Sequence, residues 1–145
     1  MADAAGSPRV HARVTADPLD PATVENFVAT ASDGAVVTFR GVVRDHDPGA
    51  DGEVVLLEYE AHPDAERLLL ECVTRVAADS GLTIAAEHRI GSLAVGDLAL
   101  VAAVAAPHRA DAFAACARLI DDLKSTVPIW KRQHSADGTT AWVGL

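Results

Sequence analysis

The sequence predicts a single-domain α+β fold with a mixed, largely antiparallel sheet and about three helices. A chain of 145 residues suits one domain with a substantial core. Half of its residues are apolar and 23% are charged, which is typical of a globular rather than a disordered protein. Strand and helix signals mix without a strict βαβ rhythm. We therefore expect one domain over residues 1–145, with residues 1–7 disordered.

Seven segments carry strand signals and three carry helix signals. Strands are predicted at residues 9–15, 35–43, 54–60, 82–90, 98–106, 129–133 and 140–143. Helices are predicted from Pro21 to about Gly34, from Pro63 to Gly81, and from His108 to about Thr126.

In the N-terminal part, apolar residues alternate with polar ones over residues 9–15, as in a half-buried strand. Asp20 and Pro21 supply an N-cap and a first-turn proline for the first helix. The next strand is rich in β-branched residues and contains Gly41, which indicates a bulge or a close backbone approach. Turn formers over residues 45–53 predict a flexible loop, after which the chain returns as a strand.

In the two longer helices, apolar residues recur at helical spacing. The inward stripe of the first is predicted to be Leu68, Leu69, Cys72, Val73 and Val76, and that of the second Phe113, Cys116, Leu119, Ile120 and Leu123. Gly81 and Pro128 end these helices. Residues 91–97 predict a turn between two strands, and residues 136–138 predict the turn of a closing pair.

Composition excludes several classes of function. With 21 acidic and 12 basic residues the net charge is −9, so the chain lacks the basic face that a nucleic-acid partner requires. No apolar run approaches the roughly 18 residues of a membrane span, and the first fifteen residues have no signal-peptide core. Cys72 and Cys116 are too few for a disulfide scaffold and lack metal-ligand spacing. We expect a cytoplasmic protein with neither metal nor cofactor.

Five motifs occur in the order of a known family. They are FRGVVRDHD (residues 39–47), LEYEAHP (57–63), HRIGSLAVGD (88–97), APHRADAF (106–113) and LIDDLKSTVPIWKRQ (119–133). Together they resemble the molybdopterin synthase large (catalytic) subunit family over roughly residues 34–143. The combination of PHRADAF with LK followed by VPIWK is highly specific.

The resemblance implies a hammerhead-like fold and a sulfurtransferase activity in molybdenum cofactor biosynthesis. In that family a small ubiquitin-like carrier subunit ends in a Gly-Gly tail with a thiocarboxylate, and the tail inserts into the large subunit. Its sulfur passes to cyclic pyranopterin monophosphate and builds the dithiolene of molybdopterin. The family assembles as a large-subunit homodimer within a heterotetramer.

The resemblance also implies the site. By position, Lys124 and Lys131 match the catalytic lysines, and Phe39, Arg44, His108 and Arg109 match residues of the substrate pocket. These residue types suit the chemistry, because arginine offers a planar fork to phosphate and a lysine can act as acid, base or amine nucleophile. The start of a helix also favours an anion.

Each of these residues also has an ordinary structural interpretation. A strand-end arginine or a first-turn arginine is commonly a solvated charge, and a lysine near a helix C-terminus complements the helix dipole. The alternative function is a non-catalytic binding module of the same fold that docks a ubiquitin-like tail or an anionic metabolite.

The spacing within the last helix predicts a pocket shared between two chains. Arg109 and Lys124 are 15 residues apart, which corresponds to about 22 Å along a helix axis. That distance exceeds what a pyranopterin monophosphate spans. If both residues serve one substrate, His108 and Arg109 must come from a neighbouring subunit of a two-fold dimer.

Overall fold

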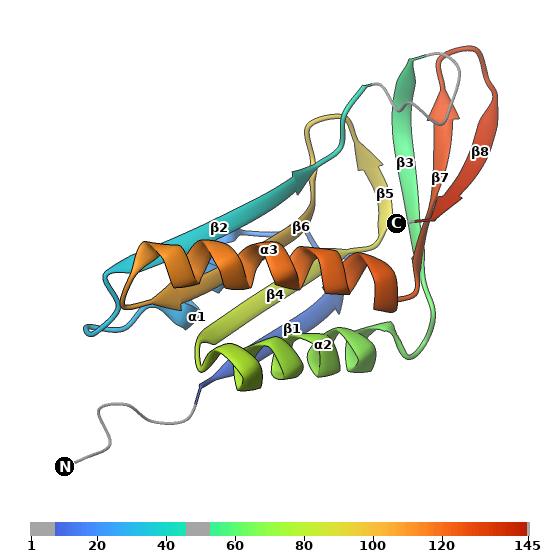
Figure 1. Cartoon of the computed structure of the whole chain (residues 1–145). Coiled ribbons are helices and arrows are strands. Elements are labelled where there is room, and N and C mark those ends of the chain that lie inside the picture. Colours follow the sequence, from blue (N-terminus) through green and yellow to red (C-terminus); the bar gives the residue numbers. More distant parts are fainter. Residues whose placement is uncertain (1–7, 46–52, 145) are drawn as a thin grey trace.

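The computed structural model describes residues 8–45 and 53–144, which form three helices and two four-stranded sheets (Figure 1). The strands are β1 (Val10–Thr15), β2 (Ala35–Val42), β3 (Val54–Ala61), β4 (Thr83–Arg89), β5 (Gly91–Ala94), β6 (Leu98–Ala106), β7 (Ile129–Ser135) and β8 (Thr140–Gly144). The helices are α1 (Pro21–Val28), α2 (Ala65–Ser80) and α3 (Arg109–Thr126). None of these helices is long and apolar enough to cross a membrane. The disorder predicted for residues 1–7 and most of the predicted loop fall outside the described residues.

The strands divide into two sheets. Sheet A has the order β1-β4-β6-β2, and sheet B has the order β5-β3-β7-β8. The pair β1–β4 is parallel, whereas the other described pairs are antiparallel. Sheet B stands at the end of sheet A where the chain leaves α3 (Figure 1). The predicted α+β class is therefore confirmed, but the strands form two sheets where the sequence predicted one.

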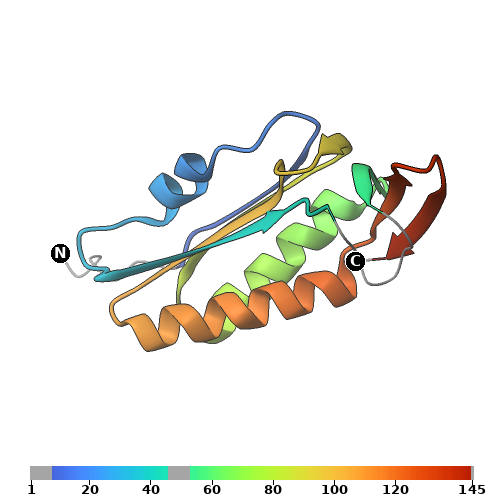
Figure 2. The same cartoon turned by 90° about the horizontal axis from the view of Figure 1, so that it is seen from above.

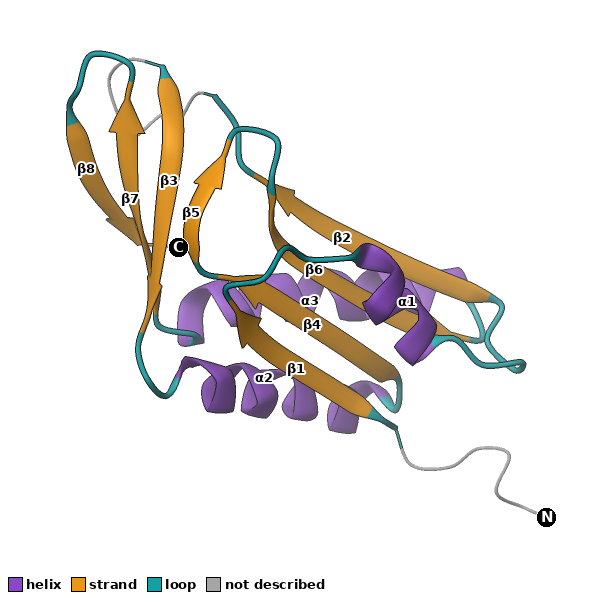
Figure 3. Cartoon of the chain, turned by 180° about the vertical axis from the view of Figure 1, so that it is seen from behind, coloured by secondary structure: helices purple, strands orange, loops and turns teal. Residues whose placement is uncertain are grey.

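Helices cover both faces of sheet A. Helix α1 lies on one face, and α2 and α3 lie side by side on the other (Figures 2 and 3). Side chains of β6 alternate between two apolar clusters because successive residues of a strand point to opposite faces. Leu100, Ala102 and Val104 pack in the cluster of α2 and α3, and Val101, Ala103 and Ala105 pack in the cluster of α1. The central strand is thus buried on both faces.

Several local predictions are confirmed in atomic detail. The carboxylate of Asp20 caps α1 by accepting the backbone N–H of Ala22 at 3.0 Å. Gly81 ends α2 with φ +73°, a left-handed conformation that glycine adopts without steric cost. Gly41 serves both roles proposed for it. The β2–β6 register shifts between Gly41 and Val42, and a Cβ on Gly41 would lie 3.3 Å from that of Leu100.

The sequence analysis left the pairing partner of one strand open and missed another strand. The returning strand β3 does not pair with β2; it lies in sheet B between β5 and β7. Residues 91–97 are not only a turn, because they contain β5, which pairs with β3. In this pair Leu93 lies opposite Leu57, and both are buried. A four-residue strand with one buried leucine has no periodic pattern of apolar residues, so the sequence could not indicate that β5 is a strand.

Two helix predictions were also wrong. Helix α1 ends at Val28 rather than near Gly34, and Thr30 bonds instead to the side chains of Ser32 and Asp33. Such short polar side chains offer local alternatives to helical hydrogen bonds. Phe113 is 61% exposed and does not join the inward stripe of α3. It lies about 100° around the helix from buried Ala112, at the margin of the stripe.

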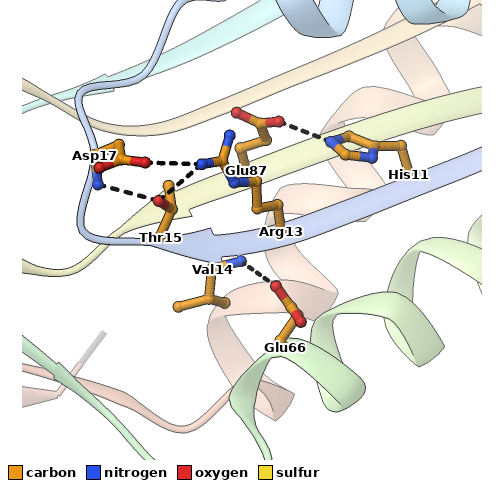
Figure 4. A network of polar contacts seen from close by, with 7 residues as sticks. All are labelled: His11, Arg13, Val14, Thr15, Asp17, Glu66 and Glu87. Atoms are coloured by element: carbon orange, nitrogen blue, oxygen red, sulfur yellow. Dashed lines mark hydrogen bonds and ion pairs between the residues drawn. The ribbon is translucent and has the colours of Figure 1, made fainter.

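Polar contacts fix the edge strand β1 (Figure 4). His11 Nε2 lies 2.7 Å from the carboxylate of buried Glu87 on β4. The backbone N–H of Val14 donates to Glu66 of α2 at 3.0 Å. Arg13 donates to Asp17 at 3.0 Å, just beyond the strand. The contact with His11 satisfies a carboxylate that would otherwise be costly to bury.

His88 and Tyr59 join the two sheets. Their rings, one at the end of β4 and one on β3, meet edge to face with centroids 5.3 Å apart. The backbone N–H of His62 donates to the carbonyl of Pro128 at 3.0 Å, which ties the segment after β3 to the segment before β7. His88 is only 2% exposed. Burial disfavours its charged form and lowers its pKa to about 4.

The packing of α2 on sheet A predicts a large loss of stability at one leucine and a small loss at its neighbour. Leu69 is fully buried, whereas Leu70 is 42% exposed. Leu69→Ala should lower the free energy of unfolding by about 2–5 kcal/mol, because it leaves a cavity in the core. Leu70→Ala is the matched control and should cost less than about 1 kcal/mol. Urea unfolding measures both, and equal losses would contradict the packing of α2 on sheet A.

The buried imidazole predicts a pH dependence of stability. Below the ordinary pKa of 6.5 the unfolded chain protonates His88, while the folded chain keeps it neutral down to about pH 4. The free energy of unfolding should therefore fall as the pH drops from 6.5 to 4, by up to about 3 kcal/mol from this residue. Unfolding of wild type and His88→Gln at pH 7.5, 6 and 5 measures this share. Identical slopes in the two proteins would show that His88 is not the cause.

Candidate active site

A cavity of about 360 Å³ lies where sheet A, sheet B and the C-terminal end of α3 meet. Its wall takes residues from β2, β3, β4, β6, α3 and β7. Four of the six residues predicted for the site lie in this wall: Phe39, Arg44, Lys124 and Lys131. Segments almost 100 residues apart in the sequence thus contribute to one concave site.

The cavity concentrates positive charge in an acidic protein. Of the described residues that line it, Arg40, Arg44, Lys124 and Lys131 are cationic, and none is acidic. The chain as a whole has a net charge of −9. Within residues 8–45 and 53–144, the two arginines and Lys124 form no ion pair, so their charges are available to a bound anion.

Strand alternation turns Lys131 toward the cavity. On β7, Lys131 lies opposite Tyr59 of β3, and both residues line the cavity. Its neighbour Arg132 is outside the cavity wall and stacks over the ring of Trp142, 4.4 Å from the centroid. Trp130 is also exposed and outside the wall. The two tryptophans therefore belong to the closing strands β7 and β8 and not to the cavity wall.

Lys124 reaches the cavity from the last turn of α3. It follows Leu123, which is buried in the core and fixes the helix against the sheet. A cation in this turn also complements the partial negative charge at the helix C-terminus. Beyond it, Pro128 leads the chain into β7, so the two lysines are separated by only six residues that change direction between them.

The end of β2 shapes the opposite wall. The bulge at Gly41 changes the course of the strand just before Arg44. Phe39 lies two residues earlier on the same strand, opposite Ala102 of β6. The Phe39 ring lies beside Gly41, where a Cβ would be 3.5 Å from Cε1 of the ring, and both residues line the cavity.

His108 and Arg109 do not join this cavity. His108 is the N-cap of α3 and Arg109 its first residue, and both are exposed. Lys124 lies about 22 Å away along the same helix. A single chain therefore does not bring all six predicted residues together, as the helix spacing predicted.

The cavity also contains polar residues that sequence reasoning did not select. These are Arg40, Tyr59 and His88. Each lies within a motif quoted above, but the strand pattern made Tyr59 and His88 indistinguishable from ordinary core residues. Their position depends on how the two sheets meet, which no local pattern encodes.

The remaining candidates stay structural. No group of three His, Cys, Asp or Glu in the described part of the chain has the arrangement of a metal site. Cys72 and Cys116 are both buried, and burial raises the pKa of each thiol. Such thiols are poor nucleophiles because little thiolate forms.

Comparison with known proteins identifies the family. The family model described as "MoaE protein" matches residues 14–126. The molybdopterin synthase catalytic subunit of Nostoc sp. is 40% identical over 134 residues, covering 86% of this chain and 78% of its own length. Molybdopterin synthase catalytic subunit 1 of Mycobacterium tuberculosis is 41% identical over 136 residues, covering 92% and 90%.

A solved structure agrees. The crystal structure of molybdopterin synthase from Staphylococcus aureus contains a chain that superposes with a TM-score of 0.84 at 33% identity. The match covers 92% of this chain and 97% of that chain. The resemblance inferred from the five motifs is confirmed: the chain belongs to the MoaE protein family, whose curated relatives are molybdopterin synthase catalytic subunits.

Proposed function

We propose that the chain is the catalytic subunit of a molybdopterin synthase. It transfers sulfur from the C-terminal thiocarboxylate of a small ubiquitin-like carrier subunit to cyclic pyranopterin monophosphate. Two such transfers build the dithiolene of molybdopterin. Family membership supports the activity, and the names of the relatives, as catalytic subunits, imply a further subunit.

The observation that carries the proposal is the cavity itself. It gathers both lysines of the chain and two arginines, although acidic residues outnumber basic ones by 21 to 12 overall. Its volume of about 360 Å³ is at the small end of ligand pockets and suits one heterocycle with a phosphate. An anionic substrate and an anionic thiocarboxylate both favour such a site.

The chemistry needs positive charge at two points. The thiocarboxylate sulfur attacks an oxygen-bearing carbon of the pyranopterin. As the carbon–sulfur bond forms, the carbon–oxygen bond at that carbon breaks and the oxygen takes up a proton and leaves, so that the product is linked to the carrier through an acyl–sulfur bond. Water then attacks the acyl carbon, and the carbon–sulfur bond to the carrier breaks to give a carboxylate and a thiol on the product. The tetrahedral intermediate carries an oxyanion that the ammonium groups of Lys124 and Lys131 stabilise. Arg44 binds the phosphate with its planar guanidinium.

The carrier tail is expected to end between the two lysines. A Gly-Gly terminus lacks side chains, so its backbone can approach Lys124 and Lys131 closely. The tail would then deliver its sulfur beside Arg44 and Phe39, where the substrate lies. With two buried free thiols, we expect the enzyme to work in the reducing cytoplasm.

The pocket is completed by a second copy of the chain. His108 and Arg109 lie at the far end of α3 and are exposed, so they can reach a neighbouring chain. In a two-fold homodimer each chain would lend this pair to the cavity of its partner. With a carrier subunit bound to each cavity, the assembly is a heterotetramer.

The competing function is a binding module that docks the tail or an anionic metabolite without turnover. A single-turnover assay separates the two. Purified chain is mixed with thiocarboxylated carrier and cyclic pyranopterin monophosphate, and sulfur in the pterin product is measured by mass spectrometry. Sulfur in the product is the expected result. Binding of both ligands without sulfur transfer would leave the binding module as the function.

Removing either lysine should abolish most of the activity. Lys124→Ala and Lys131→Ala should each lower the rate of sulfur transfer about 100-fold or more, because an oxyanion loses a positive partner. The free energy of unfolding should change by less than about 1 kcal/mol. Arg132→Ala is the matched control, since it removes the adjacent cation of β7 outside the cavity. Near-normal turnover in both lysine variants would contradict the assignment.

Mixing two inactive variants tests the shared pocket. Arg109→Ala and Lys124→Ala proteins are mixed and allowed to exchange subunits. A mixed dimer has one doubly altered pocket and one intact pocket, so full exchange should restore about a quarter of wild-type activity. Native mass spectrometry of isotope-labelled chains verifies exchange. If exchange is complete and no activity returns, the two residues do not serve one pocket across a dimer.

A further inference from the structure

His88 is a polar residue of the cavity wall that is almost fully buried. It lies near the end of β4, opposite Leu100 of β6, and packs edge to face on Tyr59. It lines the same cavity as Lys124 and Lys131, yet only 2% of the residue is exposed. A polar ring this deeply buried needs a hydrogen-bonding role for each nitrogen.

One ring nitrogen is accounted for by the backbone. Nδ1 of His88 lies 2.8 Å from the carbonyl oxygen of Arg89. A carbonyl can only accept, so Nδ1 carries the hydrogen of the neutral ring and Nε2 keeps an unshared electron pair. Burial keeps the ring neutral, since it lowers the pKa to about 4. Among the residues that the structure describes, Nε2 has no hydrogen-bond partner.

The other polar side chains of the wall have the opposite character. The described cations Arg40, Arg44, Lys124 and Lys131 are donors with no accepting atom. The Tyr59 hydroxyl can donate as well as accept. His88 in its fixed tautomer can only accept. The cavity therefore suits a ligand with two unlike parts: an anion for the cations and an N–H group for His88.

We propose that Nε2 of His88 accepts a hydrogen bond from an N–H group of the substrate heterocycle, and that this contact selects a nitrogen heterocycle over other phosphate esters. The inference rests on the proposed function, because it assigns the cavity to a pyranopterin. A reduced pterin carries ring N–H and amino donors, whereas a plain phosphate ester carries none. A ligand without the donor would leave a buried acceptor unpaired, which should weaken binding about 10- to 100-fold.

Two substitutions separate the acceptor from the packing of the ring. His88→Phe keeps an aromatic ring against Tyr59 but removes both nitrogens, whereas His88→Gln keeps an oxygen acceptor near the position of Nε2. His62→Phe is the matched control, since His62 is exposed and outside the cavity wall. Binding of cyclic pyranopterin monophosphate and of inorganic phosphate is measured for each full-length chain by calorimetry and by NMR titration, together with sulfur transfer.

His88→Phe should raise the Kd for the pyranopterin about 10- to 100-fold while the Kd for inorganic phosphate stays within about threefold of wild type. His88→Gln should restore most of the pyranopterin affinity, and His62→Phe should match wild type. In the wild-type protein, the nitrogen-15 resonance of Nε2 should move upfield on adding pyranopterin, as expected for a nitrogen that begins to accept a hydrogen bond.

Wild-type affinity in a folded His88→Phe protein, or an Nε2 resonance that does not respond to the substrate, would overturn the inference. Equal loss of both ligands in the Phe and Gln variants would also overturn it, because it would indicate a purely structural role. If wild type transfers sulfur in these cases, the proposed function stands without this contact. Failure of wild type to bind the pyranopterin at all would overturn both proposals.

Discussion

The structure depends on the burial of β6 on both faces. This strand contributes Leu100, Ala102 and Val104 to the cluster with α2 and α3, and its alternate residues to the cluster with α1. Many of its side chains are alanine, and helices contact the strand from both faces. Its hydrogen-bonded neighbours are β2 and β4. Strand β2, which leads to Arg44, strand β4, which carries His88, and helix α3, which carries Lys124, all contact this one strand.

Sheet B completes the cavity that lies at the end of sheet A. Sheet B contributes Lys131 and Tyr59, and it meets sheet A through the contact between Tyr59 and His88. The lysines on α3 and β7 can face one cavity because Pro128 ends the helix path and the chain turns into a new sheet. The positive charge of the cavity thus comes from side chains on separate helices and strands, and not from one stretch of sequence rich in basic residues.

The polar residues of the cavity differ in burial, and this difference sets what each can bind. Lys124 and Arg44 are exposed cations at its rim, where a charged side chain remains hydrated until a ligand arrives. His88 is buried, so its neutral form is preferred and its tautomer is set by a backbone carbonyl. Cationic donors and one neutral acceptor give the site two kinds of recognition from a small number of side chains.

Most of the local structure and the family could be predicted from the amino-acid sequence. Periodicity located the helices and strands, and local capping by Asp20 and Gly81 was readable because it involves only neighbouring residues. The motifs nominated Lys124, Lys131 and Arg44, which the structure brings into one cavity, although their roles stay predictions. The end of α1 was predicted too late, and Phe113 was wrongly assigned to the buried stripe of α3. Apolar periodicity is least informative at the ends of helices and at the margins of a buried stripe.

The pairing of the strands and the lining of the cavity became known only from the three-dimensional arrangement of the chain. The separation of β2 from β3 and the strand β5 depend on contacts between distant segments, which local patterns do not encode. For the same reason His88 looked like one more buried strand residue. His88 becomes a functional candidate because Tyr59 of sheet B packs against its ring at the end of β4, which buries the residue while it still lines the cavity.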